Sequence, residues 1–210
     1  MPQQRPDQRR IRGARTRQEI LGTAADVASR RGLEALTLGS LAEALEMSKS
    51  GVVRHFGSRE QLQLATVEHA AAVFAEVVLA PAAQEQPGLR RLRLVVASWM
   101  DYLLGATFSG GCFFYAAAAE VDRQPGPLRE AVVSVVQAGT GLLRADLTAG
   151  VAAGDLAPGT DVEQVLFELH GHLQQISLMH LLLADPQARE RGGRAIDELL
   201  QRHARDHLTG

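Results

Sequence analysis

Four side chains that lie close together in the sequence can donate hydrogen bonds: Lys49, Ser50, Arg54 and His55. We expect a short helix from Ser48 to His55, because Ser48 is a typical helix-capping residue. Helical spacing turns Val52 and Phe56 inward and leaves the donors on the outward face. Ammonium, guanidinium and hydroxyl donors bind phosphate oxygens and base edges, so the pattern predicts a surface for duplex DNA.

A preceding helix must hold this surface in place. Thr37 can cap it, and apolar residues recur along one of its faces at positions 41, 42 and 45. Only Glu46 and Met47 separate it from the helix that starts at Ser48. So short a connection makes the two helices cross steeply, which is the geometry that brings the second helix into a major groove.

The region around these two helices resembles the DNA-binding domain of the TetR family of bacterial transcription regulators. The matching residues are Gly32, Thr37, Leu41, Ala42, Ser48, Lys49 and the run His55-Phe56-Gly57-Ser58-Arg59-Glu60-Gln61-Leu62. The resemblance covers residues 15 to 70. It implies an all-helical dimer that binds an operator through its N-terminal domain and a small molecule through its larger C-terminal domain.

Position by position, the resemblance implies a set of DNA-binding residues: Thr37, Ser48, Lys49, Ser50, Gly51, Val53, Arg54, His55 and Arg59. Four positions in this region depart from the family pattern. Glu46 stands where the family commonly has Gly, and a positive φ angle there costs about 1 kcal/mol. Val53 and Arg54 replace aromatic residues, so a charged contact from Arg54 takes the place of a tyrosine contact. Gly51 offers no side chain to a base.

The composition separates a basic start from an acidic remainder. Of the 210 residues, the first 60 hold 11 Lys plus Arg against 7 Asp plus Glu, a net charge of +4. The other 150 carry a net charge of −6. Lys49 is the sole lysine beside 21 arginines, and a GC-rich genome explains that bias as well as selective use does. We expect the basic part to face nucleic acid.

The expected compartment is the cytoplasm. No apolar run approaches the ~18 residues needed to cross a bilayer, and the Arg-rich start lacks the apolar core of a signal peptide. We therefore expect no membrane association. Cys112 is the only cysteine, which excludes an internal disulfide and agrees with a reducing compartment.

Apolar periodicity and scarce aromatic residues predict an all-α fold of about nine helices, with a three-helix helix-turn-helix head and a larger body. Residues 1–14 are expected to be a disordered basic arm, either a solvated tail or an arm that reaches a minor groove. Residues 15–60 would form the DNA-binding domain and residues 61–210 the ligand-binding and dimerisation domain. The expected helices span 16–31, 37–45, 48–55, 58–81, 88–107, 112–121, 127–150, 160–184 and 185–207.

The fourth of these helices joins head to body, so a tilt of it would move the head. The eighth is apolar on several sides, and Gly171 in its middle costs about 1 kcal/mol unless another backbone packs closely there. We expect a homodimer through the eighth and ninth helices in a four-helix bundle, with burial inside one chain as the alternative. Two heads about 34 to 36 Å apart could then read a palindrome.

Aromatic residues cluster in two neighbouring segments, at positions 99–102 and 108–115. From them we expect Trp99, Tyr102, Phe113 and Tyr115 to line the cavity of an unknown small-molecule effector, although core packing also explains such residues. The effector would be largely apolar. The resemblance to the TetR family implies a repressor that leaves its operator when this effector binds; a regulator that has lost its effector is an alternative.

Other chemistry has weaker support. Glu168 and His172 lie four residues apart near His170 and His180, a possible edge of a metal site but also an ordinary surface pair. Cys112 is either redox-active or a buried inert thiol. A helical enzyme or metal sensor is the competing hypothesis, yet the sequence lacks a Gly-x-Ser-x-Gly elbow, a phosphate-binding Gly loop and an HExxH motif. We therefore expect no catalytic residues, no metal and no cofactor.

Overall fold

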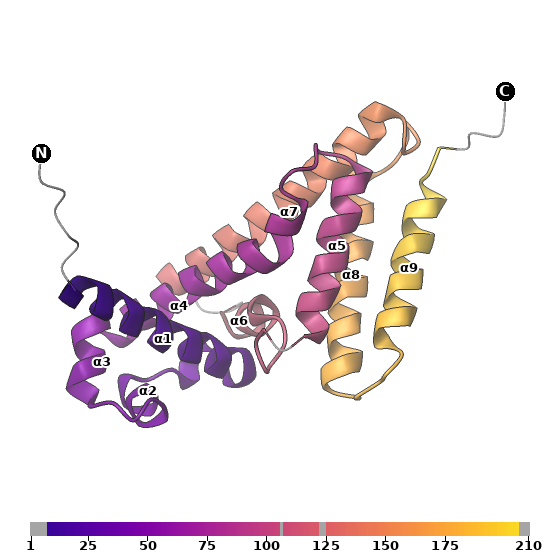
Figure 1. Ribbon diagram of the computed structural model, residues 1–210. Coiled ribbons are helices and arrows are strands. Elements are labelled where there is room, and N and C mark those ends of the chain that lie inside the picture. Colours follow the sequence, from indigo (N-terminus) through magenta and orange to yellow (C-terminus); the bar gives the residue numbers. More distant parts are fainter. Residues whose placement is uncertain (1–7, 106, 122–124, 206–210) are drawn as a thin grey trace, which may run out of the picture.

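The computed structural model describes residues 8–105, 107–121 and 125–205, and these residues form a helical protein without strands. Its α-helices are α1 (Gln8–Arg31), α2 (Leu38–Ala44), α3 (Lys49–Phe56), α4 (Arg59–Phe74), α5 (Leu89–Leu104), α6 (Phe113–Val121), α7 (Pro127–Ala153), α8 (Val162–Leu181) and α9 (Ala188–Arg202). Figure 1 shows α1, α2 and α3 gathered at one end, and α5, α7, α8 and α9 in an elongated body. The all-α expectation is confirmed.

The start of α1 corrects the expected disordered arm. The helix begins at Gln8, before the expected start at residue 16, so residues 8–14 are helical. No proline follows Pro6 in this region, and Arg and Gln are strong helix formers, which lets the helix extend past Thr16. The remainder of the expected arm, residues 1–7, lies outside the described residues.

Two boundaries in the body also differ from the expectation. Asp161, and not Thr160, caps α8, because its carboxylate accepts hydrogen bonds from the backbone N–H groups of Glu163 and Gln164, both at 3.1 Å. The last helix begins at Ala188 and ends at Arg202, so it is shorter than the expected 185–207. Asp185 instead accepts from the backbone N–H of Gln187 just before α9.

The connection between head and body is a long helix that changes type. After α4 ends at Phe74, the backbone continues as a π-helical segment, Ala75–Leu79, and a short 3-10 turn, Ala80–Ala82. π-helical turns are rare and often occur at functional sites. The α4 part packs against α1 and α7, whereas the π-helical part packs against α5. The expected end near Pro81 is confirmed.

The same helix, Arg59–Ala82, is long and apolar enough to cross a membrane by length and composition alone. Within its most apolar window, 44% of the residues are buried inside the protein. Its buried side chains include Leu62, Val67, Ala70 and Val78, which belong to the main hydrophobic core. The central helix of a folded helical protein passes this test for the same reason, so packing accounts for its composition.

A second connection between head and body runs through α6. Asp26 of α1 accepts hydrogen bonds from the backbone N–H and the hydroxyl of Ser109, both at 2.7 Å. The hydroxyl of Ser29 accepts from the N–H of Gly110 at 3.1 Å. At the other end of this segment, Glu120 accepts from the backbone N–H groups of Leu33 and Glu34, both at 2.5 Å. Residues 109–121 are thus tied to the head at both ends.

Candidate DNA-binding surface and ligand cavity

The α2–α3 pair has the caps that its sequence predicts. Thr37 caps α2: its hydroxyl accepts from the N–H of Ser40 at 2.9 Å, and the Ser40 hydroxyl accepts from the N–H of Thr37 at 3.2 Å. Ser48 caps α3 by accepting from the N–H of Gly51 at 3.1 Å. These hydroxyls are therefore used to define where each helix starts.

The turn between the two helices contains a left-handed residue. Glu46 has a φ angle of 51°, in the region that non-glycine residues adopt at a cost of about 1 kcal/mol. The N–H of Met47 then donates to the carbonyl of Ala42 at 2.8 Å, which closes the corner. The departure from glycine at position 46 therefore leaves the turn geometry intact.

The outward face of α3 carries the predicted donors. Lys49, Ser50 and Arg54 are exposed, and Val53 lies beside them on the same face. Val52 and Phe56 are buried against the rest of the head, as predicted. The Ser50 hydroxyl lies 3.2 Å from that of Ser48, and the exposed Lys49 stands between them in the sequence at the start of α3. Positive charge and the free end of a helix meet here, a combination that suits phosphate.

His55 and Arg59 have less freedom to reach DNA. His55 is half-buried, and burial, with the nearby charges of Arg54 and Arg17, lowers its pKa, so its ring is uncharged at neutral pH. The Arg59 guanidinium donates to the carbonyl of Leu36 at 3.0 Å and to that of Glu34 at 2.5 Å. Arg59 therefore ties the start of α4 to the segment that leads into α2.

Arg17 is a positioning residue that sequence reasoning missed. Its guanidinium lies 4.4 Å from the centre of the Phe56 ring and donates to the carbonyl of His55 at 2.6 Å. An arginine that binds a terminal carbonyl stabilises the end of a helix, and stacking on an aromatic ring adds to this. Arg17 thus fixes the C-terminal end of α3 against α1. Its 38-residue separation from His55 leaves no local sequence signal.

The body contains a cavity of about 380 Å³ between α4, α5, α6, α7 and α8. It is lined by Ala71, Phe74, Leu79, Trp99, Cys112, Phe114, Tyr115, Ala118, Ser134, Val135, Val136, Ala138, Gly139, Thr140, Leu142 and His170. Its volume falls within the range of small-molecule sites, about 300–1,000 Å³. Phe74 and Leu79 belong to the long connecting helix, so the cavity shares a wall with the link to the head.

Two of the four predicted ligand residues line this cavity. Trp99 and Tyr115 lie in its wall with their rings stacked, at a centroid distance of 6.4 Å. Tyr102 and Phe113 require a correction, because both are fully buried and neither is a lining residue. Both of their rings pack against Phe108 and fill the core.

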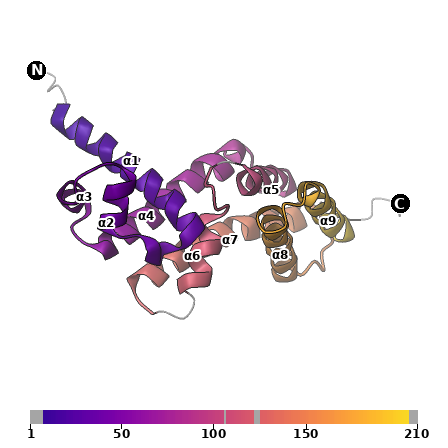
Figure 2. The same ribbon diagram turned by 90° about the horizontal axis from the view of Figure 1, so that it is seen from below.

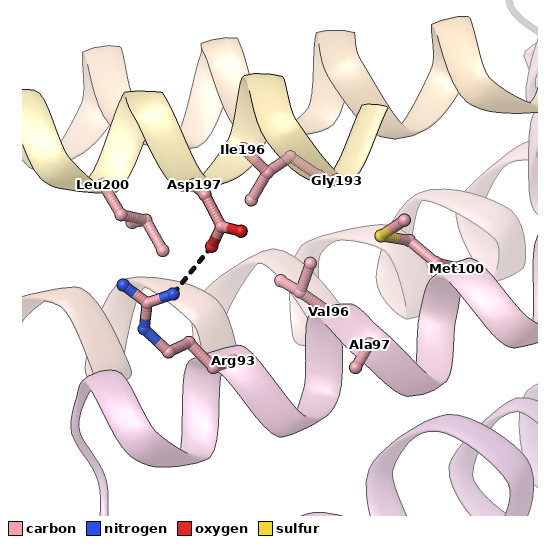
Figure 3. Close-up of a pocket in the computed structure, with 8 residues that line it drawn as sticks. All are labelled: Arg93, Val96, Ala97, Met100, Gly193, Ile196, Asp197 and Leu200. Atoms are coloured by element: carbon pink, nitrogen blue, oxygen red, sulfur yellow. Dashed lines mark hydrogen bonds and ion pairs between the residues drawn. The ribbon is translucent and has the colours of Figure 1, made fainter. Parts of the chain in front are cut away.

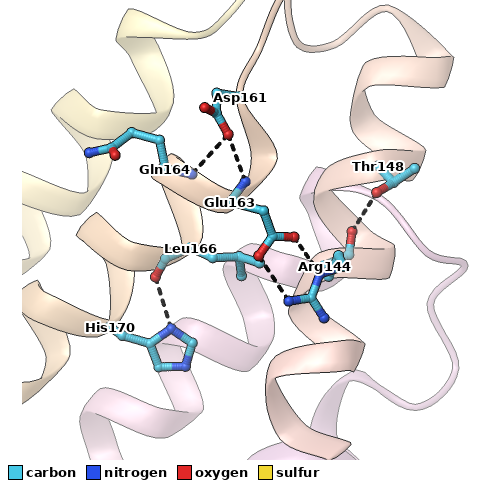
Figure 4. Close-up of polar contacts among 7 residues, drawn as sticks. All are labelled: Arg144, Thr148, Asp161, Glu163, Gln164, Leu166 and His170. Carbon is cyan, nitrogen blue, oxygen red and sulfur yellow. Dashed lines mark hydrogen bonds and ion pairs between the residues drawn. The ribbon is translucent and has the colours of Figure 1, made fainter. Parts of the chain in front are cut away.

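His170, which the sequence suggested as part of a possible metal edge, is a wall residue of the cavity. Its Nδ1 lies 2.8 Å from the Leu166 carbonyl, and because a carbonyl only accepts, Nδ1 carries the proton (Figure 4). Its ring packs edge-on against Trp99 at 5.8 Å. Glu168 is bound by Arg202 at 2.6 Å and by Gln164 at 3.1 Å. Among the described residues, no three His, Cys, Asp or Glu side chains are grouped to hold a metal.

A smaller hollow of about 160 Å³ lies between α5 and α9 (Figure 3). Arg93 of α5 and Asp197 of α9 form an ion pair across it at 2.8 Å. Met100, Val96 and Ile196 supply its apolar lining. The hollow is a seam between two packed helices, and we assign it no function.

The fold and these two sites together define a class: a helix-turn-helix protein whose donor-bearing helix is joined by one long helix to a helical body that contains a cavity. Family models agree with this assignment. The model of bacterial regulatory proteins of the tetR family matches residues 20–66, and that of the tetracyclin repressor-like C-terminal domain matches residues 88–196. The chain therefore belongs to the TetR family and is a DNA-binding transcriptional regulator.

Solved structures share the fold at low sequence identity. A TetR transcriptional regulator from Chloroflexus aurantiacus superposes with a TM-score of 0.83 and 22% identity, covering 93% of this chain and 98% of its own. A TetR-family regulator from Cytophaga hutchinsonii gives 0.79 and 22%, covering 95% and 98%. AibR, solved with isovaleryl coenzyme A and operator DNA, gives 0.67 and 20%, covering 90% and 97%. A search of curated protein sequences gave no match.

Proposed function

We propose that this regulator is a homodimeric repressor that leaves a palindromic operator when a small apolar or amphipathic molecule enters the body cavity. The observation that carries the proposal is the long helix that starts beside α3 and contributes Phe74 and Leu79 to the cavity wall. A ligand that displaces this wall displaces the helix on which the head packs. The protein acts in the cytoplasm and has no catalytic role in this proposal.

The proposed DNA contacts come from α3. Lys49 and Ser50 bind phosphates at the start of the helix, and Arg54 binds a phosphate or a guanine edge further along it. Gly51 and Val53 allow close approach of the helix to the groove, and Thr37 offers a contact at the start of α2. His55 and Arg59 contribute to DNA binding indirectly, because their contacts fix the positions of α3 and of the start of α4.

The proposed dimer interface is an apolar strip along α8. Phe167 is 76% exposed and Leu182 is 73% exposed, and Leu178 lies between them on the same side. A Cβ added to Gly171 would meet nothing within 4 Å in the single chain, so a partner backbone has room to approach there. Figure 2 shows α8 and α9 side by side at the opposite end from α1, α2 and α3. The outer side of α9 is charged, so α8 supplies most of the apolar contact.

The experiment that tests the proposal is footprinting on the DNA upstream of the chain's own gene. Lys49→Ala and Arg54→Ala are each expected to weaken binding about 10-fold, in line with about 1–3 kcal/mol for a direct DNA contact. Each variant should also reduce the dependence of affinity on salt, because one phosphate contact releases about one counterion. Arg90→Ala is the matched control, since Arg90 is an exposed arginine on α5, outside the head and outside α8 and α9. Wild-type binding by both α3 variants would exclude α3 as the reading helix.

The alternative of a regulator without an effector predicts a filled body. A cavity of about 380 Å³ lined mostly by apolar side chains does not fit that alternative. The cavity also argues against the competing enzyme hypothesis, because it brings together no activated nucleophile and no paired carboxylates among its lining residues.

A further inference from the structure

Two residues that line the cavity, Trp99 and Tyr115, carry polar groups without a hydrogen-bond partner in the described chain. The indole Nε1 of Trp99 and the hydroxyl of Tyr115 are both buried, and neither has a hydrogen-bond partner within the described chain. Trp99 is only 9% exposed. A buried donor that is left without an acceptor costs about 1–3 kcal/mol, so folded proteins seldom keep two of them in one place without a use.

Aromatic contacts hold these two donors in fixed positions. The Trp99 ring lies edge-on to Phe74 at 5.1 Å and to His170 at 5.8 Å, and it stacks on Tyr115 at 6.4 Å. These neighbours come from α4, α8 and α6, so three helices determine the position of the indole. Rigid donors of this kind select a ligand by the position of its acceptor atoms.

The cavity also lacks carboxylate, ammonium and guanidinium groups. None of its described lining residues is Asp, Glu, Lys or Arg. Burial raises the pKa of the Cys112 thiol to about 11, and burial likewise raises the pKa of Tyr115, so both groups keep their protons at neutral pH. A charged ligand would lose its hydration without meeting a carboxylate, an ammonium or a guanidinium group, which is strongly unfavourable. An uncharged ligand loses much less hydration free energy when it enters the cavity.

We propose that the effector is an uncharged, mainly apolar molecule with a carbonyl or similar acceptor oxygen, which the indole of Trp99 and the hydroxyl of Tyr115 bind. This inference rests on the proposed function, because it names the chemical class of the molecule that releases the operator. The proposed class includes ketones, lactones and esters with a compact apolar frame. It excludes fatty acids and phosphate-bearing acyl carriers, which are charged.

Three probes of one rigid frame test the inference: fluorene, 9-fluorenone and fluorene-9-carboxylate. Their affinities for the full-length protein are measured by displacement of Nile red, an uncharged fluorescent dye. The ketone is expected to bind at least 10-fold more tightly than the hydrocarbon, and the carboxylate more weakly than both. Equal binding of ketone and hydrocarbon, or preference for the carboxylate, overturns the inference.

Variants then assign the preference to the two donors. Tyr115→Phe removes one hydroxyl and keeps the ring, so it should reduce the preference for the ketone about 5- to 10-fold, the effect of one hydrogen bond, while fluorene binding stays unchanged. Trp99→Phe should act in the same direction. Tyr102→Phe is the matched control, because the Tyr102 hydroxyl is also buried without a partner but does not line the cavity. A ketone preference that survives both donor variants overturns the assignment.

The same measurements separate this inference from the proposed function. If Nile red binds and fluorene displaces it as well as fluorenone does, the cavity is a ligand site and only the named chemistry fails. If Nile red and all three probes fail to bind the folded protein, the effector site itself is contradicted, and the proposed function fails with the inference.

Discussion

The head and the body place their functional groups on opposite sides of their apolar cores. In the head, Val52 and Phe56 pack inward and leave Lys49 and Arg54 in solvent. In the body, the apolar side chains do not fill all the space between the helices, and the cavity that remains is lined by Trp99 and Tyr115, whose polar groups have no partner within the described chain. A DNA surface needs a closely packed support that keeps its shape. An effector site needs space, and it obtains that space at the expense of packing.

The two regions meet along α6. One side of this helix supplies Tyr115 and Ala118 to the cavity, and its last turn supplies Glu120 to the head. The long α4 helix has the same double role, with its start in the head and Phe74 in the cavity wall. Two helices, α4 and α6, therefore connect the head to the body. Three predictions test how strongly the contacts of α6 and of the loop before it hold the head and the body together.

The largest effect is expected from Gly110→Val. A Cβ at position 110 would lie 2.2 Å from the carbonyl oxygen of Ser29, so the loop before α6 must move away from α1. We expect the free energy of unfolding to fall by about 3 kcal/mol, near the upper end for overpacked sites. Chemical denaturation measures this change. A head and body that touch without close packing would tolerate the valine.

The control for this substitution is Gly141→Ala in α7. A Cβ there meets nothing within 4 Å, so alanine should raise stability slightly, by about 0.5–1 kcal/mol, through its better helix propensity. Opposite signs at the two glycines would show that position 110 is limited by space and not by helix propensity. Equal losses at both would contradict the close approach at Ser29.

An intermediate effect is expected from Glu120→Gln. The carboxylate accepts two hydrogen bonds from the backbone of residues 33 and 34, and an amide can accept only through its single oxygen. We expect a loss of about 2 kcal/mol, the scale of a hydrogen bond to a charged group. Hydrogen exchange at the amides of Leu33 and Glu34 should accelerate, while exchange in α8 stays unchanged. Unaltered protection at both amides would remove Glu120 from the connection.

The sequence predicted the local structure of the head better than it predicted the contacts between the head and the body. The caps at Thr37 and Ser48 and the inward side of α3 depend on residues three or four positions apart, and they were predicted correctly. Arg17 was missed because its partner lies 38 residues away, and Glu120 because its partners lie 86 and 87 residues away. Local patterns carry no information about such contacts.

The cavity shows the same limit in a different form. The clustering of aromatic residues pointed to two segments that contribute to the cavity, and Trp99 and Tyr115 line it. Tyr102 and Phe113 share that clustering yet lie fully in the core, because an unfilled space depends on how several helices pack and not on residue type. His170 was noticed for its metal-binding chemistry, whereas its observed contacts are with the Leu166 carbonyl and the Trp99 ring.

The smallest effect is expected from acid, acting at the other end of the α6 connection. Burial alone would raise the pKa of Asp26, but the hydrogen bonds from Ser109 and the charge of Arg30 outweigh it and lower that pKa below its ordinary value. A carboxylate with a lowered pKa stabilises the folded state above its unfolded pKa of about 3.9, and the stabilisation disappears as pH falls through the folded value. Wild type should therefore exceed Asp26→Asn in stability at neutral pH, and the difference should shrink below about pH 4.

Urea denaturation at a series of pH values measures this difference. Ser109→Ala gives an internal comparison, because it removes the hydroxyl donor and keeps the backbone donor to Asp26. Its stability at neutral pH should fall between those of wild type and Asp26→Asn. Since Asp26 is partly exposed, solvent screens the interaction and the whole effect should be smaller than that of Glu120→Gln. If the difference in free energy of unfolding between wild type and Asp26→Asn stays constant as the pH falls below about 4, Asp26 stabilises the junction by packing and not by its charge.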